Sequence, residues 1–261
     1  MKKKINFLKM GENSALKIDK TARKIVYLKG SLFGESVMQA QTLEEKVFKI
    51  KAELAAGNPF GEKVALVAAT KMQTAETINR AIAAGVDVVA ENKPQEFRDK
   101  NPFVAPCTRH FIGHLQTNKV KYLIGKVELF QSVDRDELAA EIAKQSLKKD
   151  IVSDILVQVN IGQESTKGGY GYETALETAN RLNATDGLRV RGFMAMLPES
   201  GDEGYLRALA KKMRALYERA KQDNADICYL SMGMSGDYKL CVEEGSNMVR
   251  LGSTIFGERQ Y

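Results

Sequence analysis

The chain has 261 residues, of which 44% are hydrophobic and 28% charged, and its formal net charge is +6. This balance argues against wholesale disorder, and the length suits one large α/β domain or two modest ones. The charge is local, because residues 1–30 hold nine basic and two acidic side chains whereas residues 31–261 hold 30 basic and 31 acidic ones. The body of the protein is therefore nearly neutral, and its charge gives no reason to expect a nucleic-acid partner.

Several classes of protein are not expected from the composition. No apolar run approaches the roughly 20 residues that a membrane-spanning helix needs. Residues 5–8 are also too few for the apolar core of a signal peptide, which has about 7–15 residues. The three cysteines lack metal-ligand spacing and predict reduced thiols in a cytoplasmic protein. With only two histidines in the chain, we expect no zinc or iron site.

From residue 42 onward, short β-branched apolar runs alternate with longer stretches of helical period. An amphipathic stretch at 43–56 comes before the first run. The apolar runs predict eight strands, at 64–69, 86–90, 110–112, 128–133, 155–160, 189–194, 227–230 and 248–251. The stretches between them predict helices at 73–84, 94–100, 116–125, 135–147, 171–184, 203–222 and 236–244.

Strand–helix alternation predicts a parallel sheet, and nearly continuous apolar strands indicate burial on both faces. Eight such units favour an α/β fold, a single (β/α)8 TIM-type barrel, with an open doubly wound sheet as the alternative. We expect residues 43–261 to form this barrel and residues 1–42 to be a basic N-terminal extension. In such a barrel, functional side chains lie just after the strands, at the C-terminal face.

The first two predicted strands end in candidate site residues. Lys71 follows the first strand, where apolar surroundings lower the pKa of an amine and make it a nucleophile able to form an imine. A solvated surface lysine is the alternative. Asn92 follows the second strand and offers a neutral amide for a ligand hydroxyl, or a helix cap before Pro94.

The next three strand ends are more ambiguous. His114 follows the third strand and is either a packed ring or a site residue. Ser132 and Asp134, after the fourth strand, have the character of a helix cap. A loop at 162–171 after the fifth strand contains Lys167 and is long enough to act as a lid or to be merely mobile.

Two loops that contain glycine and serine follow the last two strands, at 231–237 and 252–254. Backbone N–H groups and helix N-termini in such loops suit a phosphate, and barrels frequently bind phosphate at this place. A reactive lysine opposite a phosphate site indicates an aldehyde cofactor that carries a phosphate, and pyridoxal 5′-phosphate (PLP) fits. A Schiff-base aldolase acting on a sugar phosphate would satisfy the same two features.

The sequence closely resembles the PLP-homeostasis protein family, relatives of the N-terminal barrel of alanine racemase. The resemblance covers about 43–261 and rests on the segments 66–71, 110–119, 132–134, 156–160, 230–235 and 249–257. It implies a barrel that binds PLP as an internal aldimine on Lys71, with Arg250 approaching the cofactor ring. It also implies a cofactor site completed by Asn92 and by a phosphate cradle in the two loops, made of Ser231, Gly233, Ser235, Gly252 and Ser253.

The sequence departs from the family pattern at a few positions. The family commonly has an aromatic residue after the asparagine, whereas this chain has Lys93 followed by Pro94. Thr70 and Met72 flank the lysine where serine and threonine are usual. Residues 1–42 have no counterpart in the resemblance and are expected to be an added structural element, a docking segment or a tail.

The resemblance implies a cytosolic, usually monomeric carrier or regulator of vitamin B6 and amino-acid balance, without robust turnover, whose partners include PLP-dependent apoenzymes. Arg250 is a permanent cation and cannot hold a ring nitrogen in its protonated form. The sequence ends at Tyr261, so we expect no C-terminal β domain of the kind that supplies a racemase with its second base. His114 or Lys167 are the remaining candidates for that base.

Two other functions stay open from the sequence. One is a single-domain PLP-dependent amino-acid racemase-like enzyme. The other is a nucleic-acid or membrane-surface module built on residues 1–30, whose binding would fall steeply with salt.

Overall fold

The computed structural model describes residues 7–10, 14–19, 24–29, 41–164 and 167–257. The chain divides into two compact units, Met1–Ala40 and Gln41–Tyr261. The sequence placed the boundary two residues later, after residue 42.

The N-terminal unit contains a three-stranded antiparallel sheet of β1 (Phe7–Met10), β2 (Ser14–Asp19) and β3 (Lys24–Lys29), in that order. Leu8 pairs with Leu16, and Leu16 pairs in turn with Tyr27. None of these strands is among those predicted from the sequence. They have only four to six residues, and runs this short among lysines carry a weak periodic signal.

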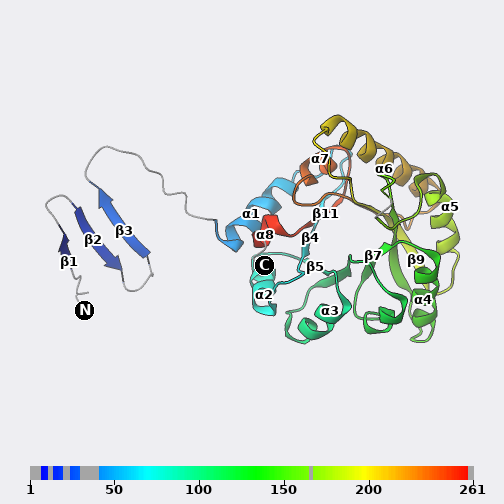
Figure 1. Cartoon of the computed structure of the whole chain (residues 1–261), viewed down its shortest axis with the longest axis horizontal. Helices are drawn as coiled ribbons and strands as arrows, with labels where there is room; N and C mark the ends of the chain where they lie inside the picture. The colour runs from blue at the N-terminus through cyan, green and yellow to red at the C-terminus, as the bar shows by residue number, and fades with distance from the viewer. Residues whose placement is uncertain (1–6, 11–13, 20–23, 30–40, 165–166, 258–261) are drawn as a thin grey trace. The chain divides into compact units, whose positions relative to one another are not determined.

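The second unit is a closed parallel barrel of eight strands (Figure 1). Its strands are β4 (Ala65–Ala69), β5 (Val88–Glu91), β6 (Thr108–Phe111), β7 (Leu129–Val133), β8 (Ser153–Val159), β9 (Leu188–Ala195), β10 (Tyr229–Ser231) and β11 (Met248–Leu251). β11 pairs with β4 and β10 with β9, so the sheet has no open edge. The predicted barrel is therefore confirmed, and the open doubly wound sheet was the wrong alternative.

Helices surround the outside of the strand ring in Figure 1. They are α1 (Leu43–Leu54), α2 (Ala75–Ala83), α3 (Pro94–Lys100), α4 (Asp136–Leu147), α5 (Tyr172–Asn183), α6 (Glu203–Asp223), α7 (Tyr238–Glu243) and α8 (Ser253–Phe256). Two 3₁₀ segments, η1 (Asn101–Phe103) and η2 (Thr117–Tyr122), join the set. The helix predicted at 116–125 is thus a 3₁₀ segment, which hydrophobic spacing alone does not distinguish from a short α-helix.

The start of α1 shows how local sequence fixes an element. The Thr42 hydroxyl accepts the Glu45 N–H, and the Glu45 carboxylate accepts the Thr42 N–H in return, which is a capping box. Val47, Ile50 and Leu54 then form the buried face of the helix. None of the described helices is both long and apolar enough to cross a membrane.

The inside of the barrel is filled by alternate residues of its strands. Toward the N-terminal ends of the strands the interior is filled by a layer of apolar side chains, namely Val67, Ala90, Leu129, Leu156, Met194 and Met248. Side chains alternate between the two faces of a strand, so the positions two residues further along also point inward. Toward the C-terminal end, four of these inward positions are polar (Asn92, Gln131, Gln158 and Arg250) and two are apolar (Ala69 and Met196). This change in character marks the candidate site.

A partly buried charge cluster ties the segment before β4 to α6. The Glu62 carboxylate accepts hydrogen bonds from Asn58, Arg214 and Lys221. The Arg214 guanidinium also stacks 3.8 Å from the centre of the Phe60 ring. Burial opposes ionisation of Glu62, but the bonds from Arg214, Asn58 and Lys221 outweigh it and lower its pKa from 4.5 to about 2.

The first prediction concerns acid stability. A carboxylate whose pKa is lower in the folded state stabilises the fold above its unfolded pKa and loses that contribution as the pH falls from about 4.5 toward about 2. Glu62→Gln should therefore cost about 2 kcal/mol of unfolding free energy at pH 7 and much less at pH 3. Urea unfolding at both pH values measures this difference.

Glu177→Gln, on the exposed face of α5, is the matched control and should change stability by less than about 0.5 kcal/mol at either pH. An equal loss for Glu62→Gln at pH 7 and pH 3 would contradict a role for the Glu62 charge.

Candidate functional site

A cavity of about 270 Å³ opens at the C-terminal ends of the barrel strands. Its walls are partly apolar, with Ala69, Ile112, Met196 and Met234 among them. Six of the residues predicted from the sequence also line it, namely Lys71, Asn92, Ser235, Arg250, Gly252 and Ser253. Strand alternation explains the convergence, since Lys71, Asn92 and Arg250 each continue the inward positions of their strands.

Arg250 is the best-defined polar side chain of the cavity. Only 5% of the residue is exposed. Its Nη1 donates to the backbone oxygen of Ser231 (2.9 Å) and to the Ser231 hydroxyl (2.7 Å), and its Nη2 donates to the backbone oxygen of Ala195 (2.9 Å). Burial lowers the pKa of Arg250 to about 10, so the guanidinium is still charged at neutral pH.

The acceptors of the Arg250 guanidinium are neutral carbonyl and hydroxyl oxygens. Within the described part of the chain, Arg250 forms no ion pair with a carboxylate. A buried charge without a counter-charge is costly in free energy. The arrangement therefore favours an anionic or electron-rich ligand in the cavity beside it.

A chain of hydrogen bonds crosses the barrel interior behind Arg250. The Ser231 hydroxyl accepts from Arg250 and donates to Gln131 Oε1 (2.7 Å), and Gln131 Nε2 lies 2.8 Å from His110 Nδ1. Burial lowers the pKa of His110 to about 4, so the ring is neutral and Nδ1 accepts from the amide. Each hydrogen bond in this series is therefore donated in the same direction, from the Arg250 cation toward His110.

These hydrogen bonds put Ser231 in a different place from the one expected. The sequence put Ser231 in the phosphate cradle, but its side chain is fully buried beneath Arg250 and is not part of the cavity wall. Gln131 and His110 were missed as contributors to the site. A polar residue at an inward position of an otherwise apolar strand was the available signal.

The two loops after β10 and β11 are joined by Ser235. Its hydroxyl accepts the N–H of Gly252 (3.4 Å) and of Thr254 (3.2 Å). Gly233 has φ of +104°, and a Cβ there would lie 2.9 Å from Tyr238 Cα, so only glycine suits this turn. Gly233 shapes the loop but does not itself line the cavity.

Asn92 reaches the cavity because β5 and β6 approach each other closely. A Cβ on Gly113 would lie 2.0 Å from the Asn92 carbonyl oxygen, so the residue beside it must be glycine. The Asn92 Oδ1 atom is buried and has no hydrogen-bond partner in the described structure. Asn92 is not a helix cap, since α3 starts after Lys93. The Lys93 side chain, at the family's aromatic position, is 71% exposed and lies near Glu96.

His114 and Lys167 do not line this cavity. The exposed His114 ring is held through Nδ1 by Asp134 Oδ2 at 2.8 Å. Lys167 Nζ lies 2.6 Å from Glu164 Oε2, within the loop after β8.

The helix cap expected from Ser132 and Asp134 is wrong. Arg135 occupies the N-cap position of α4 and makes no side-chain cap bond. Ser132 instead donates to the Gly113 carbonyl oxygen (2.5 Å), and Asp134 binds Arg135 and His114. Both side chains are buried among the strand ends and are used for tertiary bonds there.

Comparison with known proteins places the chain in a family. The model of the alanine racemase N-terminal domain matches residues 49–260. The pyridoxal phosphate homeostasis protein of Aquifex aeolicus is 40% identical over 205 residues, which is 77% of this chain and 90% of that protein. The Escherichia coli protein of the same name is 33% identical over 230 residues, which is 85% of this chain and 97% of that protein. The chain belongs to the pyridoxal phosphate homeostasis protein family.

Two similar solved structures have the same barrel. PipY of Synechococcus elongatus, solved with PLP bound, has a TM-score of 0.72 and 25% identity, and covers 83% of this chain and all of that one. Alanine racemase of Clostridium difficile has a TM-score of 0.68 at 15% identity, and the match covers 84% of this chain and 57% of that one. At this identity the likeness shows a shared fold alone.

The second prediction concerns the chain of hydrogen bonds behind Arg250. Ser231→Ala and Gln131→Leu each break the same chain, so their effects on unfolding free energy should not add. We expect a coupling of about 1 kcal/mol in a double-mutant cycle followed by urea unfolding.

Ser146→Ala is the matched control, because Ser146 is also fully buried but pairs with Ser153 elsewhere. Its effect should add to that of Gln131→Leu. Additivity of Ser231→Ala and Gln131→Leu would show that the chain of bonds is not coupled.

Proposed function

We propose that this protein binds PLP in the cavity at the C-terminal face, attached to Lys71, and acts as a carrier and regulator of the cofactor. One observation supports this most strongly: a single cavity brings together an amine, a buried uncompensated guanidinium and two glycine-bearing loops. The PLP-bound state of PipY, a relative with this fold, is consistent with it.

The residues present fit the cofactor. The cavity of about 270 Å³ is close to the lower end of small-molecule sites, about 300 Å³. Asn92 Oδ1 offers an acceptor that lacks a partner in the described part of the protein. Gly236 and Gly252 line the wall without side chains, and a Cβ on Gly236 would meet nothing within 4 Å. Backbone can therefore approach a phosphate closely there.

The chemical contributions of the chain follow from these positions. PLP supplies an aldehyde and an electron-withdrawing ring when bound. Lys71 Nζ supplies the amine for the bond to the aldehyde carbon, which forms with release of one water. Arg250 holds a positive charge at the cavity without offering a proton acceptor, and its three hydrogen bonds keep that charge in place.

A carrier is favoured over a racemase by the residues of the cavity. Lys71 and Arg250 are the only ionisable side chains among the described residues that line it. Two-base racemisation needs a proton acceptor on each face of the substrate carbon, and Arg250 does not supply one. The candidates His114 and Lys167 are engaged with Asp134 and Glu164.

The carrier role has consequences for partners and location. We propose that PLP-dependent apoenzymes receive the cofactor and that the protein acts as a monomer in the cytosol. The free state of all three cysteines suits a reducing compartment. Residues 43–261 would form the cofactor-binding unit.

The third prediction tests the attachment site. Lys71→Ala should lose the visible absorbance that the full chain acquires with PLP, while its circular dichroism spectrum is unchanged. Borohydride reduction followed by mass spectrometry should find the cofactor mass on Lys71 in the unmodified chain.

Lys93→Ala, which removes an exposed lysine outside the cavity wall, is the control and should retain the absorbance. Retained absorbance in Lys71→Ala, with no other lysine modified, would rule out this assignment.

The fourth prediction separates the carrier from the racemase-like alternative. In D₂O, the PLP-loaded chain should introduce no more deuterium at Cα of a panel of amino acids than free PLP does. Mass spectrometry of the recovered amino acids measures this exchange. Rapid exchange that Lys71→Ala abolishes would instead favour the enzyme.

A further inference from the structure

Two side chains on one turn of α3 contact the backbone on both sides of Lys71. Lys100 Nζ donates to the carbonyl oxygen of Thr70 at 3.0 Å. Glu96 Oε2 accepts the N–H of Met72 at 2.8 Å. The peptide groups immediately before and after Lys71 are therefore both held by the same short helix.

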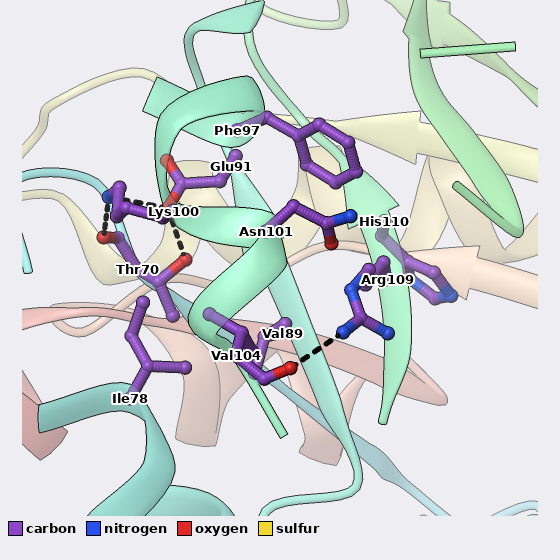
Figure 2. Close-up of a pocket in the computed structure, with 10 residues that line it drawn as sticks. All are labelled: Thr70, Ile78, Val89, Glu91, Phe97, Lys100, Asn101, Val104, Arg109 and His110. Atoms are coloured by element: carbon purple, nitrogen blue, oxygen red, sulfur yellow. Dashed lines mark hydrogen bonds and ion pairs between the residues drawn. The ribbon is translucent and has the colours of Figure 1, made fainter. Parts of the chain in front are cut away.

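The two side chains also support each other. Glu96 and Lys100 are four residues apart and form an ion pair of 3.0 Å, which is the spacing at which helix side chains meet. Lys100 is only 15% exposed and lies 2.7 Å from Glu91 Oε1. Figure 2 shows Lys100 between Thr70 and Glu91, beside a second, small cavity that is separate from the candidate site and that Phe97 of α3 also lines.

Glu91, the last residue of β5, links this cluster to a second strand of the barrel. Thr70 Oγ1 donates to Glu91 Oε1 at 2.7 Å, so the ends of β4 and β5 are tied together (Figure 2). Burial raises the pKa of Glu91 despite these bonds. Glu91 immediately precedes Asn92, so the same cluster sets the starting points of two cavity residues.

The turn that carries Lys71 needs such support. Met72 has φ of +63°, a left-handed conformation that is unfavourable for a residue with a side chain. More than half of Met72 is exposed, so packing of its own side chain does little to hold the turn. The bond from its N–H to Glu96 fixes the conformation from outside.

We propose that Glu96 and Lys100 are positioning residues for Lys71, which orient its amine toward the cofactor. The inference rests on the proposed function and deepens it. Neither residue lines the cavity, so each acts through the peptide groups that flank Lys71. Correct placement of a nucleophile contributes strongly to rate, and a displacement of about 1 Å lowers a rate by as much as about a hundredfold.

The experiment compares Glu96→Ala with Glu96→Gln in the full chain freed of cofactor. Glutamine keeps an oxygen for the Met72 N–H, whereas alanine does not. We expect the rate of PLP attachment to fall about tenfold in Glu96→Ala and to stay within about threefold of the unmodified rate in Glu96→Gln. Hydrogen exchange of the peptide containing residues 70–73 should accelerate in the same order, and this second measurement needs no cofactor.

Glu141→Ala is the matched control. Glu141 is 24% exposed, as is Glu96, and it also lies near a lysine of its own helix, but α4 carries it away from the Lys71 turn. It should change neither the attachment rate nor the exchange of residues 70–73. Melting temperatures of all three variants report any general loss of stability.

The outcomes are distinct. An unmodified attachment rate in Glu96→Ala, with or without a lower melting temperature, overturns the positioning role and leaves the proposed function standing. A slow rate in Glu96→Gln equal to that in Glu96→Ala overturns the role of the Met72 bond. Failure of the unmodified chain to attach PLP at all overturns the proposed function, and this inference with it.

Discussion

The pairing of β11 with β4 is the contact on which the site depends. It joins the last barrel strand to the first and sets Arg250 beside Val67 and Leu251 beside Ala68. Gly252 follows Leu251 directly, and Lys71 comes three residues after Ala68. The Lys71 amine and the two glycine-bearing loops are brought to one cavity because the sheet closes in this register.

Closure of the barrel also buries the positive charge of Arg250. Arg250 points into the buried interior of the barrel, where its guanidinium donates only to neutral acceptors. Ser231, Gln131 and His110 continue the bonds across the interior, and the neutral His110 ends the chain without adding a second charge. The cation is thus held in place without an ion pair to a carboxylate of the described residues, and under the proposed function a bound phosphorylated cofactor would supply the negative and electron-rich groups.

Different parts of the fold support the two ends of the cavity. On one side, the chain of hydrogen bonds inside the barrel fixes Arg250. On the other, α3 lies outside the barrel and holds the turn of Lys71 through Glu96 and Lys100. The residues that bond to Arg250 differ from those that bond to the Lys71 turn, although His110 lines the same small cavity as Thr70 and Lys100.

The barrel and the candidate residues at its strand ends could be predicted from the sequence alone. Strand periodicity is a local property, so the eight strands and the residues at their ends, including Lys71 and Arg250, are readable without a structure. The direction of the Ser231 side chain was not, because it depends on which strands are neighbours across the barrel. The contacts of Glu96 and Lys100 with the Lys71 turn were equally hidden, since α3 reaches β4 only after packing. Composition and spacing describe each segment alone, whereas bonds between segments exist only once the sheet has closed.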